Sequence, residues 1–253
     1  MRRLVIRPGA IGDVVVSLPA LEFLRCEYLE VWTAVRTLPL VRFADCARAI
    51  SSTGLDFLGV ADPPPHLIGE LGSFDSIVSW YGSNRPEFRD AVAGLPFEFL
   101  PALPAAGCPL HATDYYLHQV GAPLGQFPRI ALPAAEPHED YAVIHPFSGS
   151  PRKNWPLEKF RAVAARLPMP IRWCAGQDDP PLPEAVFVPD LLDLARFLAG
   201  AALYVGNDSG ITHLAAAVGT PTLAIFVASD PAVWAPRGPN VRVAQSFGPP
   251  QLP

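Results

Sequence analysis

Short apolar runs alternate with segments whose apolar residues recur every three or four positions. Residues 4–7 (LVIR) form a short run of the β type. From residue 13 onward, Val14, Leu18 and Leu21 recur at helical spacing. A glycine-containing turn separates the two segments. The pattern therefore predicts a strand, a tight turn and a helix at the start of the chain.

The same alternation continues to the end of the chain. In the first half it predicts strands at 31–35, 55–60, 74–80 and 97–100, and helices at 41–50, 86–95 and 111–120. In the second half it predicts strands at 141–145, 171–175, 185–188, 202–205, 222–227 and 241–243, and helices at 157–167, 191–198 and 211–218. Alternating strands and helices are typical of parallel sheets with helices on both faces.

Residues 121–140 interrupt this alternation, because they carry four prolines and no clear periodicity. We expect the boundary between two domains there, with an N-terminal domain over residues 1–137 and a C-terminal domain over residues 138–253. The predicted fold class is α/β, with two Rossmann-like, doubly wound domains.

Composition narrows the class of protein. Half of the residues are hydrophobic and 17% are charged, which is typical of a globular protein rather than a disordered one. The net charge is −5 and no block of Lys or Arg occurs, so nucleic acid is not expected as a partner. The four cysteines are far apart, and no apolar run is long enough to span a membrane. We expect a cytoplasmic protein with free thiols.

Three segments carry candidate chemistry, and the first is 7–13 (RPGAIGD) at the end of the first strand. Ligands of open α/β sheets bind at this end of a strand. The segment lacks the GxGxxG pattern of dinucleotide sites and the GK[ST] of a P-loop. Asp13 has two interpretations, as a helix N-cap or as a carboxylate that accepts a proton from a substrate.

The second segment is 145–156 (HPFSGSPRKNWP), between a predicted strand and a predicted helix. Small residues such as Ser148 and Gly149 let the backbone approach a ligand closely, and Lys153 offers a charge for a phosphate. The alternative is that Arg152 and Lys153 belong to a solvated turn.

The third segment is 206–217 (GNDSGITHLAAA), where a strand leads into a helix that opens with Ser209 and Gly210. The first amides of a helix form an anion site. Asp208 is a candidate ligand or a helix cap, and His213 a ligand or a structural residue. No GxSxG or HxxxH pattern occurs in the chain, so neither a nucleophilic triad nor a metal site is expected.

Together and in this order, the segments resemble glycosyltransferase family 9, the heptosyltransferases of lipopolysaccharide core assembly. Residues 7–21 are similar to the family's N-terminal signature, and 153–156 (KNWP) to its Lys-x-Trp-Pro element. Residues 207–217 are similar to its donor-site helix, and 230–236 to the end of its next loop.

The resemblance implies a GT-B fold, in which two Rossmann-like domains face a central cleft. It implies an inverting, metal-independent transfer of a sugar from a nucleotide-diphosphate donor, with ADP-heptose expected and no further cofactor. The implied acceptor is a lipopolysaccharide-core or other glycan, free or lipid-linked. Peripheral contact with the inner face of the cytoplasmic membrane is left open.

Matching the motifs residue by residue implies roles for individual side chains. Asp13 falls on the residue proposed as the family's general base, with Gly12 beside it on the acceptor side. The residues that fall on donor-binding positions are Ser148, Gly149, Lys153, Asp208, Ser209, Gly210 and His213. Asp178 or Asp179 is the best match for the acidic residue at the nucleotide ribose.

Two other functions are considered beside this one. The chain is shorter than the family's usual members, and 226–230 (FVASD) stands where the family has a Phe-Gly-Pro-Thr-Asp type of loop. A catalytically reduced protein that only binds a nucleotide sugar is therefore the alternative. An NAD-dependent oxidoreductase of the same fold is disfavoured by the missing GxGxxG.

Overall fold

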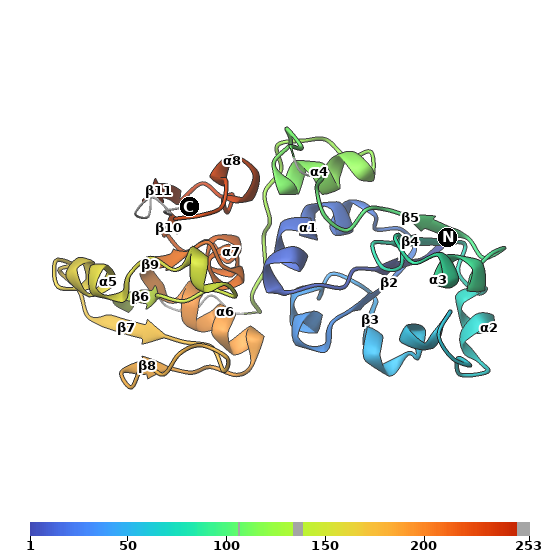
Figure 1. The fold of residues 1–253 in the computed structure, drawn as a ribbon, viewed down its shortest axis with the longest axis horizontal. Coiled ribbons are helices and arrows are strands. Elements are labelled where there is room, and N and C mark those ends of the chain that lie inside the picture. The colour runs from blue at the N-terminus through green and yellow to red at the C-terminus, as the bar shows by residue number, and fades with distance from the viewer. Residues whose placement is uncertain (106, 134–138, 247–253) are drawn as a thin grey trace, which may run out of the picture. The chain divides into compact units, whose positions relative to one another are not determined.

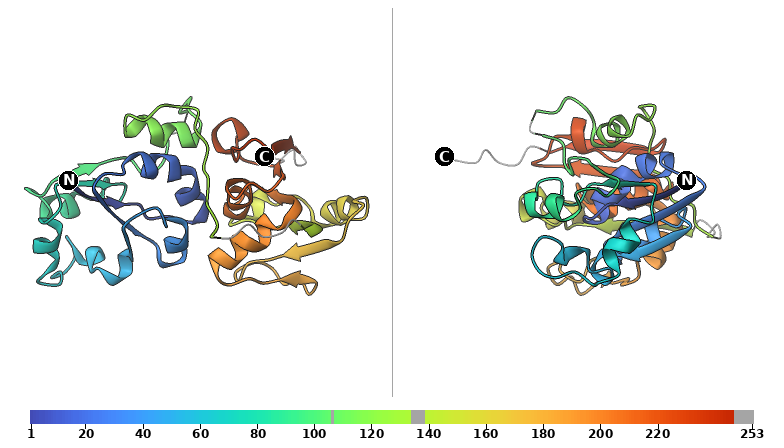
Figure 2. Two further views of the ribbon diagram at one scale, coloured as in Figure 1. Left: turned by 180° about the vertical axis from the view of Figure 1, so that it is seen from behind. Right: turned by 90° about the vertical axis from the view of Figure 1, so that its right-hand side faces the viewer.

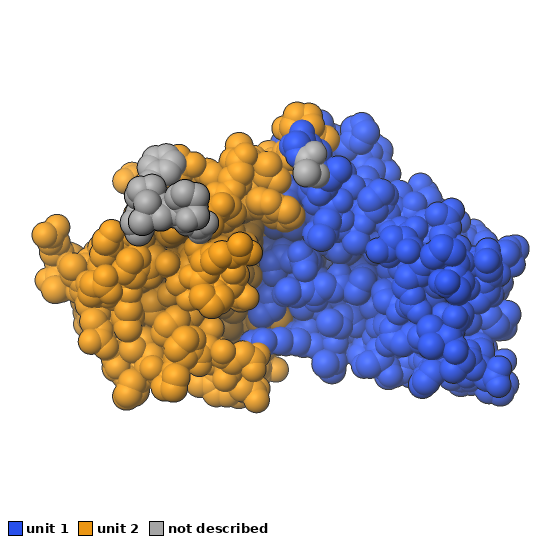
Figure 3. Space-filling model, in the orientation of Figure 1, with its two compact units in different colours: residues 1–108, 112–126 blue, residues 109–111, 127–253 orange. Residues whose placement is uncertain are grey.

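The computed structural model describes residues 1–105, 107–133 and 139–246. The chain divides into two compact units (Figure 3). The first contains Met1–Cys108 and Ala112–Gln126, and the second Pro109–His111 and Phe127–Pro253. The boundary expected at residue 137/138 falls on residues 134–138, which lie outside the described part of the chain.

The first unit is built on a five-stranded sheet with the strand order β3-β2-β1-β4-β5 (Figure 1). All of its strand pairs are parallel. Its strands are β1 (Arg2–Ile6), β2 (Tyr28–Thr33), β3 (Cys46–Ala49), β4 (Ser76–Ser79) and β5 (Phe97–Phe99). Its helices are α1 (Ile11–Phe23), α2 (Leu67–Leu71), α3 (Pro86–Ala91) and α4 (Ala112–Gln119), with 3₁₀ turns η1 (Val35–Leu40), η2 (Ile50–Ser52) and η3 (Leu55–Phe57).

Alternate residues of β1 face opposite sides of this sheet. Leu4 and Ile6 pack into a core that includes Trp32 and Phe88. Helices α1 and α4 pack against each other, and Figure 2 shows them side by side. Leu4, Val5 and Ile6 are all fully buried, so the second half of this central strand has no face left for water, which explains why these three residues are apolar.

Two predicted elements of this unit are wrong. The helix expected at 41–50 is instead the edge strand β3, which pairs with β2 in parallel register. The strand expected at 55–60 is the 3₁₀ turn η3, bounded by Gly54 and Gly59 at φ +79° and +76°. Leu55 and Leu58 both enter the core, and a three-residue spacing matches a 3₁₀ turn rather than the alternation of a strand.

The second unit has a six-stranded sheet with the order β11-β10-β9-β6-β7-β8, in which all pairs are parallel. Its strands are β6 (Glu139–His145), β7 (Ile171–Cys174), β8 (Ala185–Val186), β9 (Ala201–Asn207), β10 (Thr222–Phe226) and β11 (Val241–Gln245). Its helices are α5 (Leu157–Ala164), α6 (Leu191–Ala199), α7 (Gly210–Ala217) and α8 (Pro231–Trp234), with the 3₁₀ turn η4 (Pro151–Lys153). Every strand predicted for this half is present.

Both faces of this sheet are covered. Ile144, Val205 and Ile225 form a core cluster with Phe160 of α5. The neighbouring residue Tyr204 points to the other face, where its hydroxyl lies 3.1 Å from that of Thr212 on α7. The two parallel sheets with their covering helices confirm the predicted α/β class.

The strand order of the second unit is that of a Rossmann fold, with β6 first and β9 fourth along the chain. These two strands are neighbours, and the connections that follow them diverge, so their carboxyl ends border a natural ligand site. Within the described residues, no helix has the length and apolar character needed to cross a bilayer.

Candidate functional site

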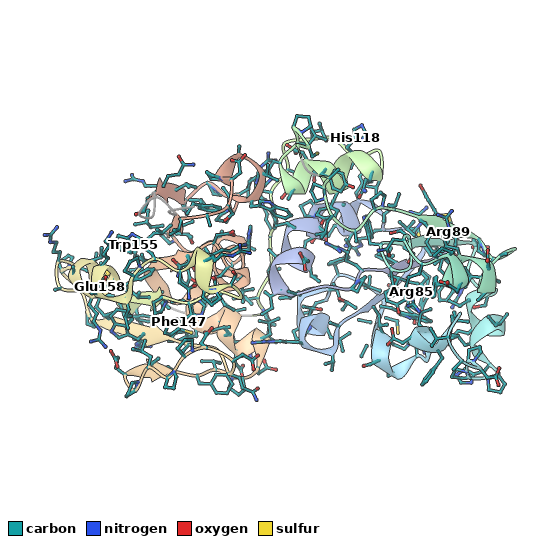
Figure 4. The ribbon with its side chains drawn as sticks, viewed as in Figure 1. Arg85, Arg89, His118, Phe147, Trp155 and Glu158 are labelled. Carbon is teal, nitrogen blue, oxygen red and sulfur yellow. The ribbon has the colours of Figure 1, made fainter. Side chains whose placement is uncertain are left out.

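The loop after β6 and the turn after β9 lie side by side, because the strand register pairs His145 with Gly206. The loop carries Phe147 and Trp155, which are labelled in Figure 4. The Trp155 ring packs edge-on against Phe160 at 5.1 Å between centroids, and its indole N–H donates to Ser246 Oγ at 2.9 Å. The aromatic ring thus anchors the far end of the loop to the core.

A charged cluster lies where these two segments meet. Lys153 Nζ donates to Asp208 Oδ2 at 2.8 Å. The hydroxyl of Ser229, on the loop after β10, hydrogen-bonds to the same carboxylate oxygen. The Lys153 side chain is 39% exposed, whereas that of Asp208 is 5% exposed. A buried carboxylate thus fixes an ammonium group that keeps donors free for an anion.

Ser229 is a member of this cluster that the sequence reasoning missed. It stands directly before Asp230, which caps α8 by accepting from the Ala232 N–H at 2.9 Å. A hydroxyl residue in the 226–230 loop, at the Thr position of the family's loop type, was the signal available in the sequence. The altered loop therefore still supplies a hydroxyl to Asp208.

Helix α7 begins at Gly210, and Ser209 is its N-cap. The Ser209 hydroxyl accepts a hydrogen bond from the Thr212 N–H at 3.3 Å. The alternative that Asp208 caps this helix is therefore wrong, since its carboxylate binds Lys153 and Ser229. His213 lies buried one turn into the helix. The positive end of α7 consequently opens directly beside the charged cluster.

Ser148 and Gly149 lie at the tip of the loop and differ in their surroundings. The Ser148 hydroxyl is bonded inside the loop, at 2.7 Å from Asn154 Oδ1 and 2.9 Å from the Ser150 carbonyl. Gly149 is exposed, and nothing lies within 4 Å of where a Cβ would stand. Ser148 therefore shapes the loop, while the backbone at Gly149 is open to a ligand.

In the first unit, Asp13 occupies the third position of α1, and the N-cap is Ala10. Its Oδ2 accepts the Ala10 N–H at 2.9 Å, so the carboxylate closes the first turn from inside the helix. A side chain at Gly9 would come within 2.7 Å of Asp13 Cβ, and Gly9 has φ +133°. The N-cap interpretation of Asp13 is thus wrong in position, although the residue does stabilise the helix start. Gly12 is a half-buried residue of the same turn.

Arg7 is a second residue that the sequence reasoning left out of the site. Only 2% of it is exposed, and its Nη2 donates to the Asp13 carbonyl at 2.9 Å. Its Nε donates to Ser17 Oγ at 3.1 Å, and its guanidinium lies 4.7 Å from the centre of the Tyr116 ring. Burial raises the pKa of Tyr116, so this ring stays neutral beside the cation. Arg7 holds the first turn of α1, and with it Asp13, in place.

A histidine–carboxylate pair lies at the end of β6. His145 Nε2 is 3.1 Å from Asp179 Oδ2, which also accepts the Gly176 N–H at 2.6 Å. This oxygen of Asp179 is thus engaged within the protein, and a ribose contact by Asp178 or Asp179 stays a prediction. Among the described residues, no three His, Cys, Asp or Glu side chains are grouped closely enough to hold a metal ion.

The structure brings the predicted donor-side residues to one end of the second unit's sheet. Lys153 follows β6, and Asp208, Ser209, Gly210 and His213 follow β9. Asp13 and Gly12 belong to the first unit. The roles of these residues stay predictions, but the loop and turn that carry them are those that the sequence singled out.

Comparison with known proteins adds a family match. The model of glycosyltransferase family 9 (heptosyltransferase) matches residues 189–251. Lipopolysaccharide heptosyltransferase 1 of Pseudomonas aeruginosa is 31% identical over 134 residues, which cover 47% of this chain and 38% of that protein. The chain thus spans about two fifths of the length of this curated relative.

Solved structures extend the likeness to nearly the whole chain. The E. coli ADP-heptose heptosyltransferase II matches with a TM-score of 0.75 and 16% identity, over 96% of this chain and 90% of that one. The E. coli heptosyltransferase WaaC with ADP-2-deoxy-2-fluoro heptose matches with a TM-score of 0.63 and 18% identity, over 96% and 93%. These matches confirm the GT-B type of fold. The chain is thus similar to glycosyltransferase family 9 in sequence over residues 189–251, which include the third motif, and similar in fold to heptosyltransferases over nearly its whole length.

Proposed function

We propose that the chain is a glycosyltransferase of the heptosyltransferase type. In this proposal it transfers a sugar, with inversion at the anomeric carbon, from a nucleotide-diphosphate donor. We take ADP-heptose as the donor, because one structural relative is the E. coli ADP-heptose heptosyltransferase II and another was solved with ADP-2-deoxy-2-fluoro heptose. The acceptor is a glycan hydroxyl of the lipopolysaccharide core, free or lipid-linked, and the protein contacts the membrane only peripherally.

The observation that carries the proposal is the Lys153–Asp208 pair beside the start of α7. A half-exposed ammonium group and a helix N-terminus converge at the carboxyl ends of β6 and β9. Both features attract phosphate, and this edge of the sheet is where Rossmann folds bind nucleotides. We therefore assign the donor diphosphate to this position, with Ser148, Gly149 and His213 around it.

The proposed reaction needs one proton acceptor and one site of charge stabilisation. The Asp13 carboxylate takes the proton of the acceptor hydroxyl, whose oxygen attacks the anomeric carbon from the face opposite the diphosphate. The bond from that carbon to the diphosphate oxygen breaks, and the negative charge moves onto the leaving group. Lys153 and the first amides of α7 stabilise this charge, a preorganised contribution that typically reaches several kcal/mol. No metal ion takes part in the proposed reaction.

The test is a panel of nucleotide sugars that includes ADP-heptose, UDP-glucose and GDP-mannose, with ADP and adenosine as partial ligands. A donor present at ~100 times its Kd adds about 2.7 kcal/mol to the stability of the folded state, which a thermal melt detects. The stabilising donor is then incubated with lipopolysaccharide core acceptors, and transfer is followed by mass spectrometry. Stabilisation without transfer to any acceptor would favour the binding-only alternative, and no stabilisation by any member would contradict the donor site itself.

A further inference from the structure

Asn207, the last residue of β9, stands out because its polar side chain is fully buried and uses both ends of its amide. Its exposed fraction is 0%. Its Oδ1 accepts the Trp155 backbone N–H at 2.8 Å, and its Nδ2 donates to the Pro146 carbonyl at 2.7 Å. The two partners lie at opposite ends of the loop that carries Ser148, Gly149 and Lys153.

Only a side-chain amide suits this position. Buried backbone groups need hydrogen-bond partners, and here one partner must accept while the other donates. A carboxylate could accept from Trp155 but could not donate to Pro146. An apolar side chain would leave both groups unsatisfied. The strand register explains the meeting, since His145 pairs with Gly206 and the next residues are Pro146 and Asn207.

The neighbouring residue completes the arrangement. Asp208 binds the ammonium group of Lys153, which lies inside the loop whose two ends Asn207 joins. Two consecutive residues at the end of β9 thus fix the loop: Asn207 binds its two ends, and Asp208 binds the ammonium group of Lys153. The loop has further internal bonds, from the Lys153 N–H to the Ser150 carbonyl at 2.9 Å and from Ser148 to Asn154. Asn207 is the residue that joins both ends of this folded loop to the sheet.

We propose that Asn207 is a positioning residue, which clamps both ends of the 146–155 loop so that Lys153 reaches the donor diphosphate. The last part of this inference rests on the proposed function. The two hydrogen bonds that form the clamp are present in the protein without ligand, so they can be tested without a donor. The two parts therefore need separate measurements.

The first measurement uses the unliganded protein and the variants Asn207→Ala and Asn207→Asp. We expect the Trp155 amide to exchange slowly in the wild type, because it is bonded to Asn207, and fast in Asn207→Ala. In Asn207→Asp, which keeps an accepting oxygen, we expect an intermediate rate. The chain has two lysines, Lys153 and Lys159. Acetylation of Lys153, normalised to Lys159 in the same protein, should accelerate several-fold in both variants, because each loses the bond to Pro146.

The second measurement is donor affinity. We expect Asn207→Ala to weaken ADP-heptose binding about tenfold, because a misplaced Lys153 would lose its charge-assisted contact with the diphosphate. Adenosine has no diphosphate, so its binding should be nearly unchanged. In a Lys153→Ala background the same change should have little further effect, because the clamp would have no lysine to place. Asn240→Ala is the matched control, since the contact of that amide with the Gly219 carbonyl is exposed and long, at 3.5 Å.

The outcomes separate the two proposals. Unchanged Trp155 exchange and Lys153 acetylation in a folded Asn207→Ala protein would overturn the clamp, whatever the ligand results. Additive losses of affinity in the double variant would overturn its link to Lys153. If the wild type binds no nucleotide sugar, the proposed function fails, and the clamp is still decided by exchange and acetylation. A melting curve identifies any variant that is unfolded, and Asn207→Asp then decides from the same two measurements.

Discussion

Lys153 and Asp208 form an ion pair whose partners differ sharply in exposure. The carboxylate is buried and is also bonded to Ser229, so the pair is held from the protein side while the lysine faces solvent. An arriving phosphate can share the ammonium group without displacing the carboxylate, since the group has three donors. The pair therefore presents a preformed positive charge to an arriving anion, which a salt bridge closed off from solvent could not do.

From this arrangement we expect Lys153→Ala to weaken binding of a nucleotide sugar about tenfold or more, because a charge-assisted hydrogen bond contributes ~1.5–3 kcal/mol. Binding of the bare nucleoside should be little affected, since it has no diphosphate. Isothermal calorimetry with ADP-heptose and adenosine measures both. Lys159→Ala serves as the control, because that exposed lysine lies over the Trp155 ring and not beside Asp208. Equal losses for the two ligands would argue against this placement of the diphosphate.

Asp13 combines a structural and a proposed chemical role. Its Oδ2 accepts the Ala10 N–H, and an asparagine carbonyl oxygen at the same place can accept that bond as well. We therefore expect Asp13→Asn to fold normally and to keep its donor affinity. Turnover should fall ~10²-fold or more, because an amide cannot take the proton of the acceptor hydroxyl. Steady-state transfer rates and a thermal melt of the purified variant measure the two effects.

The matched control for this change is Asp190→Asn. Asp190 caps α6 in the second unit, where its Oδ1 accepts the N–H groups of Leu192 and Asp193 at 2.8 and 2.9 Å. It is a helix-start aspartate outside the candidate site, so its substitution should leave turnover unchanged. Wild-type turnover in a folded Asp13→Asn protein would exclude the base role and leave Asp13 a helix-stabilising residue.

At the scale of elements, the four cysteines differ in how well the surrounding structure buries their thiols. Cys174 ends β7 and is buried, whereas Cys26, Cys46 and Cys108 are half-buried, and all four are free thiols. Burial, helped by the nearby charge of Asp179, raises the pKa of Cys174 to about 12. The reactive thiolate is therefore almost absent at neutral pH in the folded protein.

We expect iodoacetamide at pH 8 to modify Cys174 much more slowly than the other three cysteines, and to modify all four at similar rates in urea. The same shift bears on stability. A thiol has a pKa of about 8.5 when unfolded, so the folded state holds this proton more tightly. The contribution is complete below about pH 8.5 and is lost as the pH rises toward 12. Mass spectrometry of the alkylated peptides measures the rates, and fast labelling of Cys174 in the native protein would contradict its burial.

The elements also show where local patterns fail. The strand β3 is a short edge strand of the sequence Cys-Ala-Arg-Ala, which has no β-branched residue and little apolar alternation. Its conformation depends on hydrogen bonds to β2, and on Arg48, which pairs with the buried Glu30. Strand β2 and Glu30 lie too far before β3 in the chain for a local sequence pattern to include them. In contrast, β6, β9 and β10 are buried on both faces, and their apolar runs were sufficient to predict them.

At the scale of the whole molecule, the proposed reaction must stabilise the charge of a departing diphosphate. In our proposal Lys153 and the helix α7 supply this stabilisation. We therefore expect transfer activity and donor affinity to survive dialysis and excess EDTA. Activity assays before and after treatment, with metal content measured alongside, check this. A loss of activity that magnesium, manganese or iron restores would require a cation in the mechanism.

The sequence by itself determined the parts of this protein that depend on local physics. Doubly covered strands need unbroken apolar runs, and helix starts need small or capping residues. These signals placed the two parallel sheets, the loop with Lys153 and the start of α7. They also predicted a division of the chain into two halves, because a proline-rich segment cannot continue either pattern.

Only the tertiary structure decided which polar groups meet. Ser229 reaches Asp208 from a different loop, Asn207 joins the two ends of the Lys153 loop, and Arg7 is buried on the ring of Tyr116. The partners in these contacts are from 21 to 109 residues apart in the chain. A hydrogen bond depends on atoms within about 3 Å of each other and not on sequence distance, so strand order and register had to bring these side chains together first.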